Sequence, residues 1–214
     1  MQLLEFDNVP FLLGVAGGSG SGKSTLASAL RDELGADLCV VLCFDRYYKD
    51  LADRPVAERA RVNFDHPDSL DVDLFAAHLD ELRAGRGVDV PRYDFANHTR
   101  RSASDRIEPR PVVVVEGILL FAVPELAARL DHSVFVRASE DVRLARRIAR
   151  DRVARGRSEA SVRTQFAATV GPMHDRFVAP SATTADEIVS GEQPFASVVA
   201  ELSALVGERI RKRI

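Results

Sequence analysis

Gly17-Gly18-Ser19-Gly20-Ser21-Gly22-Lys23-Ser24-Thr25 is the stretch of sequence that decides the fold of this chain. It matches the pattern G-x-x-x-x-G-K-[ST], directly after an apolar run at 11–16 and directly before a segment with helical periodicity. Glycines let backbone N–H groups converge on an anionic phosphate without β-carbon clashes, and the following helix adds positive potential. The pattern predicts a phosphate-binding loop between a strand and a helix. A flexible glycine–serine linker is the alternative, and the strand–helix context disfavours it.

The residues of this loop, 17–25, are expected to bind the phosphates of a nucleoside triphosphate. Lys23 is expected to reach the β- and γ-phosphate oxygens, and the Ser24 hydroxyl to coordinate Mg²⁺. Glu116 directly follows four valines at 112–115. A carboxylate at the C-terminal end of a central strand points into the crevice where α/β sheets bind ligands, so we expect Glu116 beside the Mg²⁺. A solvated strand-end carboxylate is the weaker interpretation.

The rest of the chain alternates short apolar runs with longer amphipathic segments. This alternation predicts an α/β fold with a P-loop NTPase-type parallel β-sheet flanked by helices. Strands are expected at residues 11–16, 38–43, 112–115, 132–136 and 185–189. Helices are expected at residues 23–34, 69–82 and 140–155, and from about residue 194 onward.

The stretch from about residue 55 to 110 differs from its surroundings because it carries Pro, Gly and polar residues and only two weak strand segments, at 88–90 and 104–107. We expect an insertion, part helix and part hairpin, that rests on the sheet edge and forms the acceptor site. Residues 1–214 are otherwise expected to form a single domain, because 214 residues are too few for two well-buried ones.

Composition narrows the class of protein further. The formal net charge of −3 gives no argument for nucleic acid or an anionic membrane as partner. The sequence shows no signal-peptide pattern and no apolar run long enough to span a bilayer, so a cytoplasmic protein is expected. Cys39 and Cys43 are interpreted as free thiols on a strand in a reducing compartment, in preference to a metal site or a disulfide.

Further motifs, taken together and in order around the P-loop, resemble those of the uridine (uridine–cytidine) kinases. They are Asp45-Arg46-Tyr47-Tyr48-Lys49-Asp50, Asn63-Phe64-Asp65-His66-Pro67-Asp68, Pro91-Arg92-Tyr93-Asp94-Phe95-Ala96-Asn97-His98-Thr99-Arg100, Val115-Glu116-Gly117-Ile118-Leu119, Arg147-Ile148-Ala149-Arg150-Asp151, Arg155-Gly156-Arg157 and Pro172-Met173-His174. The matches run from about residue 11 to 189. The resemblance implies transfer of the ATP γ-phosphoryl group to the 5′-hydroxyl of uridine or cytidine, with Mg²⁺, by a homotetramer.

The resemblance also implies an acceptor site. Asp45, at the end of the second strand, is the implied base for the acceptor hydroxyl; a turn-starting Asp is the alternative. Asp65 is implied to accept hydrogen bonds from the ribose hydroxyls. Aromatic and imidazole side chains are implied to contact the base or sugar: Tyr48, Phe64, Tyr93, Phe95 and His98. A lone histidine is more often structural, and His98 is singled out only by the motif around it.

Seven arginines lie between residues 143 and 157, and about residues 143–160 are expected to form a lid. Arg147 and Arg150 are expected to be catalytic, and Arg155 to lie near the ATP phosphates. Arg157 and Gln165 are implied to face the nucleoside. The competing interpretation is a solvated helix face whose arginines pair with Glu140, Asp141 and Asp151.

Three positions depart from the family pattern. Arg137 stands where an acidic residue is usual after the fourth strand, and residues 190–193 lack a glycine pair near the expected adenine site. Cys43-Phe44 before Asp45 is also unusual. These departures leave the choice between ATP and GTP as donor open, and do not touch the implied acceptor site.

Other functions are weaker alternatives. A different small-molecule kinase, phosphoribulokinase-like or pantothenate-kinase-like, would not require Tyr93, Phe95 and His98 as a base-recognition set. A non-catalytic ATP-binding regulator would not need a carboxylate at Asp45. Nucleic-acid binding through the arginine helix is disfavoured by the negative net charge and the lack of a recognition motif.

Overall fold

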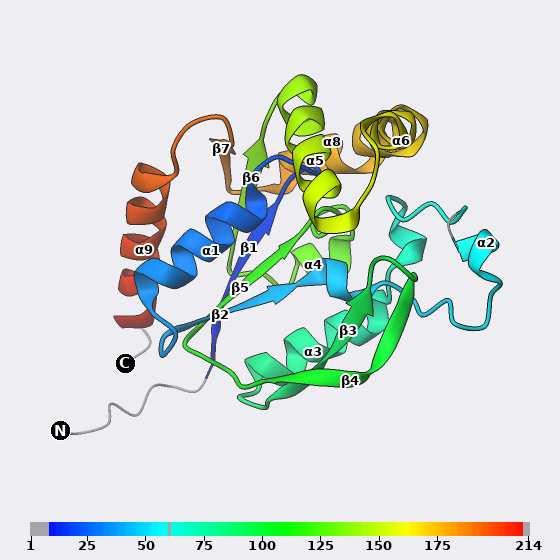
Figure 1. Cartoon of the computed structure of the whole chain (residues 1–214). Coiled ribbons are helices and arrows are strands. Elements are labelled where there is room, and N and C mark those ends of the chain that lie inside the picture. Colours follow the sequence, from blue (N-terminus) through cyan, green and yellow to red (C-terminus); the bar gives the residue numbers. More distant parts are fainter. Residues whose placement is uncertain (1–8, 60, 212–214) are drawn as a thin grey trace.

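A five-stranded parallel sheet forms the centre of the molecule in the computed structural model, which describes residues 9–59 and 61–211 (Figure 1). The strand order is β2-β5-β1-β6-β7, and all four neighbouring pairs are parallel. The strands are β1 (Phe11–Ala16), β2 (Cys39–Cys43), β5 (Val112–Gly117), β6 (His132–Arg137) and β7 (Glu187–Ser190). The predicted fold class is confirmed, and each predicted strand lies within two residues of its observed bounds.

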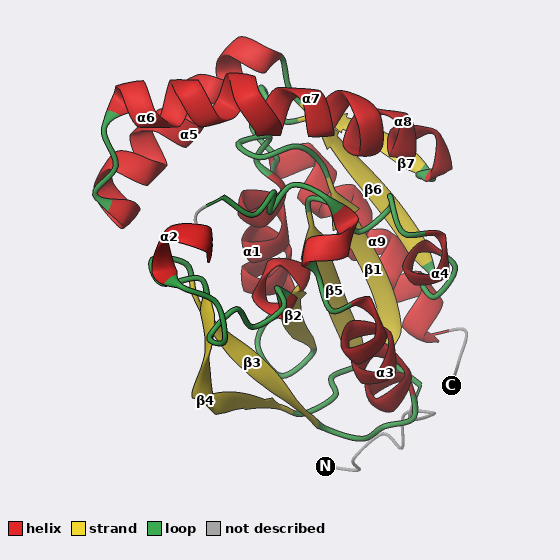
Figure 2. Cartoon of the chain, turned by 90° about the vertical axis from the view of Figure 1, so that its right-hand side faces the viewer, coloured by secondary structure: helices red, strands yellow, loops and turns green. Residues whose placement is uncertain are grey.

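Helices cover both faces of this sheet (Figure 2). The long ones are α1 (Lys23–Leu34), α3 (Val72–Arg83), α5 (Glu140–Arg155) and α9 (Ala196–Arg211). Shorter ones are α2 (Val56–Arg59), α4 (Pro124–Ala127), α6 (Glu159–Gln165), α7 (Gly171–Met173) and α8 (Ala179–Ser181). Wider π-type turns at Phe166–Val170 and His174–Val178 join α6, α7 and α8 into a nearly continuous helical arm that the sequence analysis did not predict.

Alternating side chains of the strands enter two apolar cores. On one face Leu13 and Val15 of β1 pack with α1 and α9, and on the other Leu12 packs with α3 and α4. All four valines at 112–115 are fully buried, as expected for a central parallel strand. The two cysteines of β2 are free thiols, as expected from the sequence.

The insertion after β2 contains a hairpin, β3 (Val88–Asp94) and β4 (Thr99–Ile107), which is a separate two-stranded antiparallel sheet. The hairpin is longer than the two predicted segments because Pro91 and many charged residues obscure its strand pattern. It packs against the 3₁₀ turn Phe44–Tyr47 that follows the edge strand β2. The Arg100 guanidinium fixes this contact by donating to the carbonyl oxygens of Tyr47 and Tyr48 at 3.2 and 2.9 Å.

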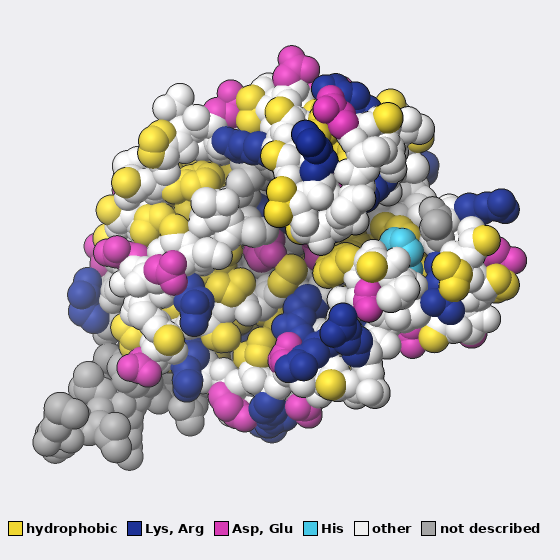
Figure 3. Space-filling view, viewed as in Figure 1, with side chains coloured by type: hydrophobic (Ala, Val, Ile, Leu, Met, Phe, Trp, Pro, Cys, Tyr) yellow, Lys and Arg dark blue, Asp and Glu magenta, His cyan; other side chains and the backbone are white. Residues whose placement is uncertain are grey.

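Basic and acidic side chains are interspersed on the face shown in Figure 3. Some of the charged side chains pair with one another: Arg46 and Arg92 both contact the carboxylate of Asp105. Among the helices in the described part of the chain, none has both the length and the apolar character that crossing a membrane requires.

Candidate active site

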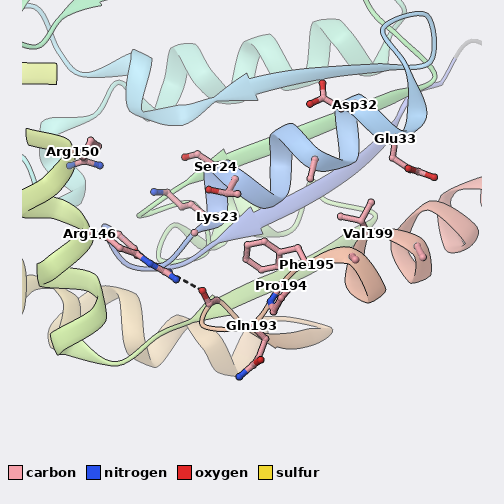
Figure 4. A pocket seen from close by; sticks show the side chains of 17 residues that line it. Lys23, Ser24, Asp32, Glu33, Arg146, Arg150, Gln193, Pro194, Phe195 and Val199 are labelled. Carbon is pink, nitrogen blue, oxygen red and sulfur yellow. Dashed lines mark hydrogen bonds between the residues drawn. The ribbon is translucent and has the colours of Figure 1, made fainter. Parts of the chain in front are cut away.

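The loop predicted to bind phosphates connects β1 to α1 and borders a cavity of about 1090 Å³ (Figure 4). No side chain caps the N-terminus of α1, so its first N–H groups are free to meet an anion. Gly20 has a φ of 82°, and a β-carbon there would lie 2.4 Å from the carbonyl oxygen of Arg143. The arginine-rich helix α5 therefore packs directly on the loop, at a position that only glycine can occupy.

The predicted metal and phosphate residues lie together: Lys23 and Ser24 line this cavity, and Glu116 contacts both of them. Ser24 Oγ donates to Glu116 Oε2 at 3.1 Å, and Lys23 Nζ lies 4.0 Å from the same oxygen. Lys23 and Glu116 are buried. Asp45 follows β2 and accepts a long contact, 3.5 Å, from the backbone N–H of Ile118. Loss of solvation raises the pKa of Asp45, with Glu116 adding to the rise and Lys23 opposing it.

These side chains fit a hard divalent cation. Ser24, Glu116 and Asp45 offer only oxygen atoms, which Mg²⁺ prefers. Within residues 9–59 and 61–211 no group of three or more His, Cys, Asp or Glu side chains is arranged to hold a metal by itself. This arrangement suits Mg²⁺, because the ion is usually bound by one or two protein oxygens together with substrate phosphates and water.

The five aromatic side chains predicted to meet the acceptor form one cluster between the hairpin and the end of β2. The Tyr48 ring lies 5.4 Å from Phe64, 5.2 Å from Tyr93 and 6.3 Å from Phe95, between ring centroids. The His98 ring stacks on Phe64 at 4.4 Å with an interplanar angle of 13°. Tyr93 lies in β3, and His98 lies in the tight turn after it with a φ of 55°. A strand and the turn that follows it therefore supply the two side chains.

Two polar features of this cluster are suited to a ligand. The Tyr93 hydroxyl is buried and has no hydrogen-bond partner among residues 9–59 and 61–211. The Asp65 carboxylate accepts a weak hydrogen bond from the Thr169 hydroxyl, at 3.4 Å, and burial raises its pKa while Arg147 and Arg155 lower it. Burial, followed by the charges of Arg155 and other arginines, lowers the pKa of His98, which keeps this ring neutral.

The predicted lid residues converge from α5 and α6. Arg147 donates to Ser19 Oγ of the P-loop at 2.8 Å and to Gln165 Oε1 at 2.9 Å, and Arg157 donates to the same Gln165 oxygen. The Arg155 guanidinium lies 5.2 Å above the Phe95 ring, and Arg150 lines the cavity next to the P-loop. Arg143 and Arg147 are buried, whereas Arg150 is exposed.

Sequence reasoning missed three residues that shape the donor end of the cavity. Arg146 donates to the carbonyl oxygen of Gly191 at 2.8 Å and makes longer contacts to carbonyl oxygens of the P-loop (Figure 4). Gly191 is so close to the loop that a β-carbon on it would lie 1.9 Å from the Ser21 carbonyl oxygen. Phe195 lies against Gly22 and lines the cavity. The unusual composition of residues 190–193 was the one sequence signal for this segment.

Comparison with known proteins identifies the family. The model of the phosphoribulokinase / uridine kinase family matches residues 12–193. Uridine kinase of Chloroflexus aurantiacus is 51% identical over 199 residues, which cover 91% of this chain and 95% of that protein. Uridine kinase of Ligilactobacillus salivarius is 39% identical over 97% of each chain.

Solved structures agree at the level of the fold. The phosphoribulokinase of Rhodobacter spheroides superposes with a TM-score of 0.62 at 16% identity, over 88% of this chain and 74% of that one. D-glycerate 3-kinase of Cryptococcus neoformans gives a TM-score of 0.64 at 14% identity, over 90% of each chain. The expected family is thereby confirmed: the chain is a P-loop phosphotransferase that belongs to the phosphoribulokinase / uridine kinase family.

Proposed function

We propose that this enzyme transfers the γ-phosphoryl group of ATP to the 5′-hydroxyl of uridine or cytidine, giving UMP or CMP. The observation that carries the proposal is the continuity of two groups of side chains: Lys23, Ser24 and Glu116 contact one another, and Asp45 lies close enough to influence both this group and Tyr48 of the aromatic cluster. In that cluster the buried Tyr93 hydroxyl has no hydrogen-bond partner among the described residues. A phosphate-binding site and a site suited to a flat polar ring are thus adjacent. The relatives named uridine kinase support the same acceptor class.

Each side chain of the proposed site has a defined role in phosphoryl transfer. The 5′-hydroxyl oxygen forms a bond to the γ-phosphorus while the bond from that phosphorus to the β–γ bridging oxygen breaks, which leaves ADP. Asp45 orients the hydroxyl and accepts its proton late in the transfer. Lys23, Arg147 and Arg150 neutralise negative charge on the phosphates. Ser24 and Glu116 would hold Mg²⁺, which adds further neutralisation when it is bound.

The acceptor is recognised by the insertion and the lid. Asp65 accepts hydrogen bonds from the ribose hydroxyls, and the Tyr93 hydroxyl and the neutral His98 ring bond to the edge of the base. Phe64, Phe95 and Tyr48 provide its apolar walls. Arg157, in the loop before α6, and Gln165, at the end of α6, already bond to one another and close over the nucleoside. Arg155 approaches the phosphates from above Phe95.

An assay of ADP release with MgATP and a panel of acceptors tests the proposal. The panel contains uridine, cytidine, adenosine, ribulose 5-phosphate, pantothenate and no acceptor, and a Lys23→Ala variant is the control for contaminating activity. Release that depends on uridine or cytidine is expected. Release only with ribulose 5-phosphate or pantothenate would favour another small-molecule kinase, and acceptor-independent release would contradict a nucleoside kinase.

The cytoplasmic location and the homotetramer expected from the family resemblance belong to the same proposal. Light scattering of the purified chain tests the second, since a tetramer of a 23.5 kDa chain and a monomer differ fourfold in mass.

A further inference from the structure

Asp151 on α5 is a fully buried carboxylate surrounded by guanidinium groups. Its Oδ1 accepts a hydrogen bond from Arg150 Nε at 2.9 Å. Its Oδ2 lies 3.7 Å from Arg147 Nε, 3.7 Å from Arg155 Nη1 and 3.5 Å from Arg157 Nη1. One carboxylate therefore lies beside four guanidinium groups, and Asp65 is a second carboxylate that acts on Arg147 and Arg155.

The bonding of this carboxylate is incomplete. Oδ2 has no hydrogen-bond partner among the described residues, although three guanidinium groups lie within 3.7 Å of it. The Nε of Arg147 likewise lacks a hydrogen bond. The attraction between Asp151 Oδ2 and these guanidinium groups depends on charge more than on directed hydrogen bonds. One arginine can therefore move away from the carboxylate without breaking a hydrogen bond to Oδ2. Without Asp151 the buried Arg147 would lose a nearby countercharge, and the four arginines would repel one another more strongly.

Each of the four arginines reaches a different part of the crevice. Arg150 lines the donor cavity on the side where Lys23 and Ser24 lie (Figure 4). Arg147 bonds to Ser19 of the P-loop, Arg155 lies over Phe95 of the acceptor cluster, and Arg157 bonds to Gln165 of α6. Asp151 itself lines none of the described cavities. Asp151 contacts the arginines that face the donor and the acceptor, so any effect of Asp151 on the reaction passes through these arginines.

We propose that Asp151 is a positioning residue that holds the lid arginines in a converged arrangement before nucleotide binds. Triphosphate oxygens then take over Arg150 N–H groups, which are exposed to the cavity, while Asp151 keeps the buried Arg147 in place. The inference rests on the proposed function, because it assigns these arginines to the transferring phosphate and the nucleoside. A carboxylate in this position lowers the free-energy cost of ordering the arginine side chains during the reaction.

The variant Asp151→Asn tests this proposal, because it keeps the shape of the side chain and removes its charge. Glu159→Gln is the matched control: it removes one carboxylate charge from the neighbouring helix α6, where Glu159 is exposed and pairs only with Arg163 among the described residues. We expect Asp151→Asn to lower kcat about 10- to 100-fold, with a smaller change in KM for MgATP. The Glu159→Gln enzyme should stay within twofold of the parent enzyme.

A double-mutant cycle separates positioning from a purely structural role. In an Arg150→Ala background, where the exposed one of the phosphate-facing arginines is missing, Asp151→Asn should lower kcat by a factor at least threefold smaller than it does in the parent enzyme. An equal cost in both backgrounds, or a kcat of Asp151→Asn within twofold of Glu159→Gln, would overturn the proposal.

Asp151→Glu carries the same cycle if the Asn variant does not fold, because it keeps the charge and displaces it by one methylene. Intermediate activity is expected, and an equal cost of Asp151→Glu with and without Arg150 would contradict the proposal. The parent enzyme on the acceptor panel reports separately on the proposed function. A parent enzyme that phosphorylates neither uridine nor cytidine would contradict the assigned substrate. Zero coupling between Asp151 and Arg150 would contradict only the role proposed for Asp151.

Discussion

Asp45 combines two opposing requirements within a single side chain. Burial and the nearby Glu116 carboxylate favour its neutral form, while Lys23, the Ile118 N–H group and Arg150 favour the ionised form that can accept a proton. A base whose pKa is raised in this way is better matched to a proton released late in phosphoryl transfer.

Replacing Asp45 by Asn should lower kcat about 100-fold or more, because the amide keeps the shape of the side chain and accepts no proton. Binding of MgATP should be nearly unchanged, which titration calorimetry can measure beside steady-state rates. Turnover near that of the parent enzyme would remove Asp45 from the mechanism.

Tyr93 offers a sharper test of nucleoside recognition. Its hydroxyl is buried without a partner, so Tyr93→Phe should leave the melting temperature unchanged or higher while it raises the nucleoside KM about 5- to 20-fold. Tyr47→Phe is the matched control, because the Tyr47 hydroxyl already bonds to His78 Nδ1 at 2.7 Å. That variant should lose about 1 kcal/mol of stability and keep its KM. A Tyr93→Phe variant that loses stability and keeps its nucleoside KM would contradict a role of this hydroxyl in binding the nucleoside.

At the scale of elements, the loop after β7 is held against the P-loop without room for a side chain. A β-carbon on Gly191 would lie 1.9 Å from the Ser21 carbonyl oxygen, so Gly191→Ala must push the two segments apart. We expect KM for MgATP to rise about tenfold or more and the protein to lose about 1–3 kcal/mol of stability. Gly207→Ala in α9, where the nearest atoms are 3.9 Å away, should be neutral or stabilising. An equal KM for MgATP in the Gly191→Ala and Gly207→Ala variants would contradict the assignment of Gly191 to the ATP site.

The elements that sequence predicts well are those with a local signal. The P-loop pattern, the four buried valines and the arginine helix at 140–155 each carry a periodicity or motif, and their observed bounds agree with the predicted ones. The helical arm at 159–181 was missed because Gly171, Pro172 and Pro180 interrupt its sequence and π-type turns shift its period.

The candidate site shows the same division. Motifs identified the residue types that meet substrate, but the burial of Asp151 and the approach of Gly191 to the P-loop depend on contacts between segments far apart in sequence. Such contacts have no local pattern, since they are produced by packing of the complete chain.

For the molecule as a whole, the helical arm and the sheet meet at the P-loop through His174. Its ring fills the space beside Gly18, where a β-carbon would lie 2.9 Å from it, and it lines a small cavity with Ser19 and Asp65. Burial is the larger cause and the Arg143 charge the smaller cause that lower the pKa of His174 to about 4. The folded protein therefore keeps this histidine neutral where the unfolded chain, with an ordinary pKa of about 6.5, takes up a proton.

The sign of the resulting pH dependence follows from these two values. Between about pH 6.5 and about 4 the unfolded state binds more protons at this site, so stability falls as the solution is acidified, by at most about 1.4 kcal/mol per pH unit from this group. His174→Gln has no such group, so we expect its free energy of unfolding to decrease less than that of the parent protein between pH 7 and pH 5. Urea titrations at both pH values measure the difference, and carboxylates common to the two proteins cancel from it. Parallel losses in the parent and the variant would mean that protonation of His174 does not couple the arm to the P-loop.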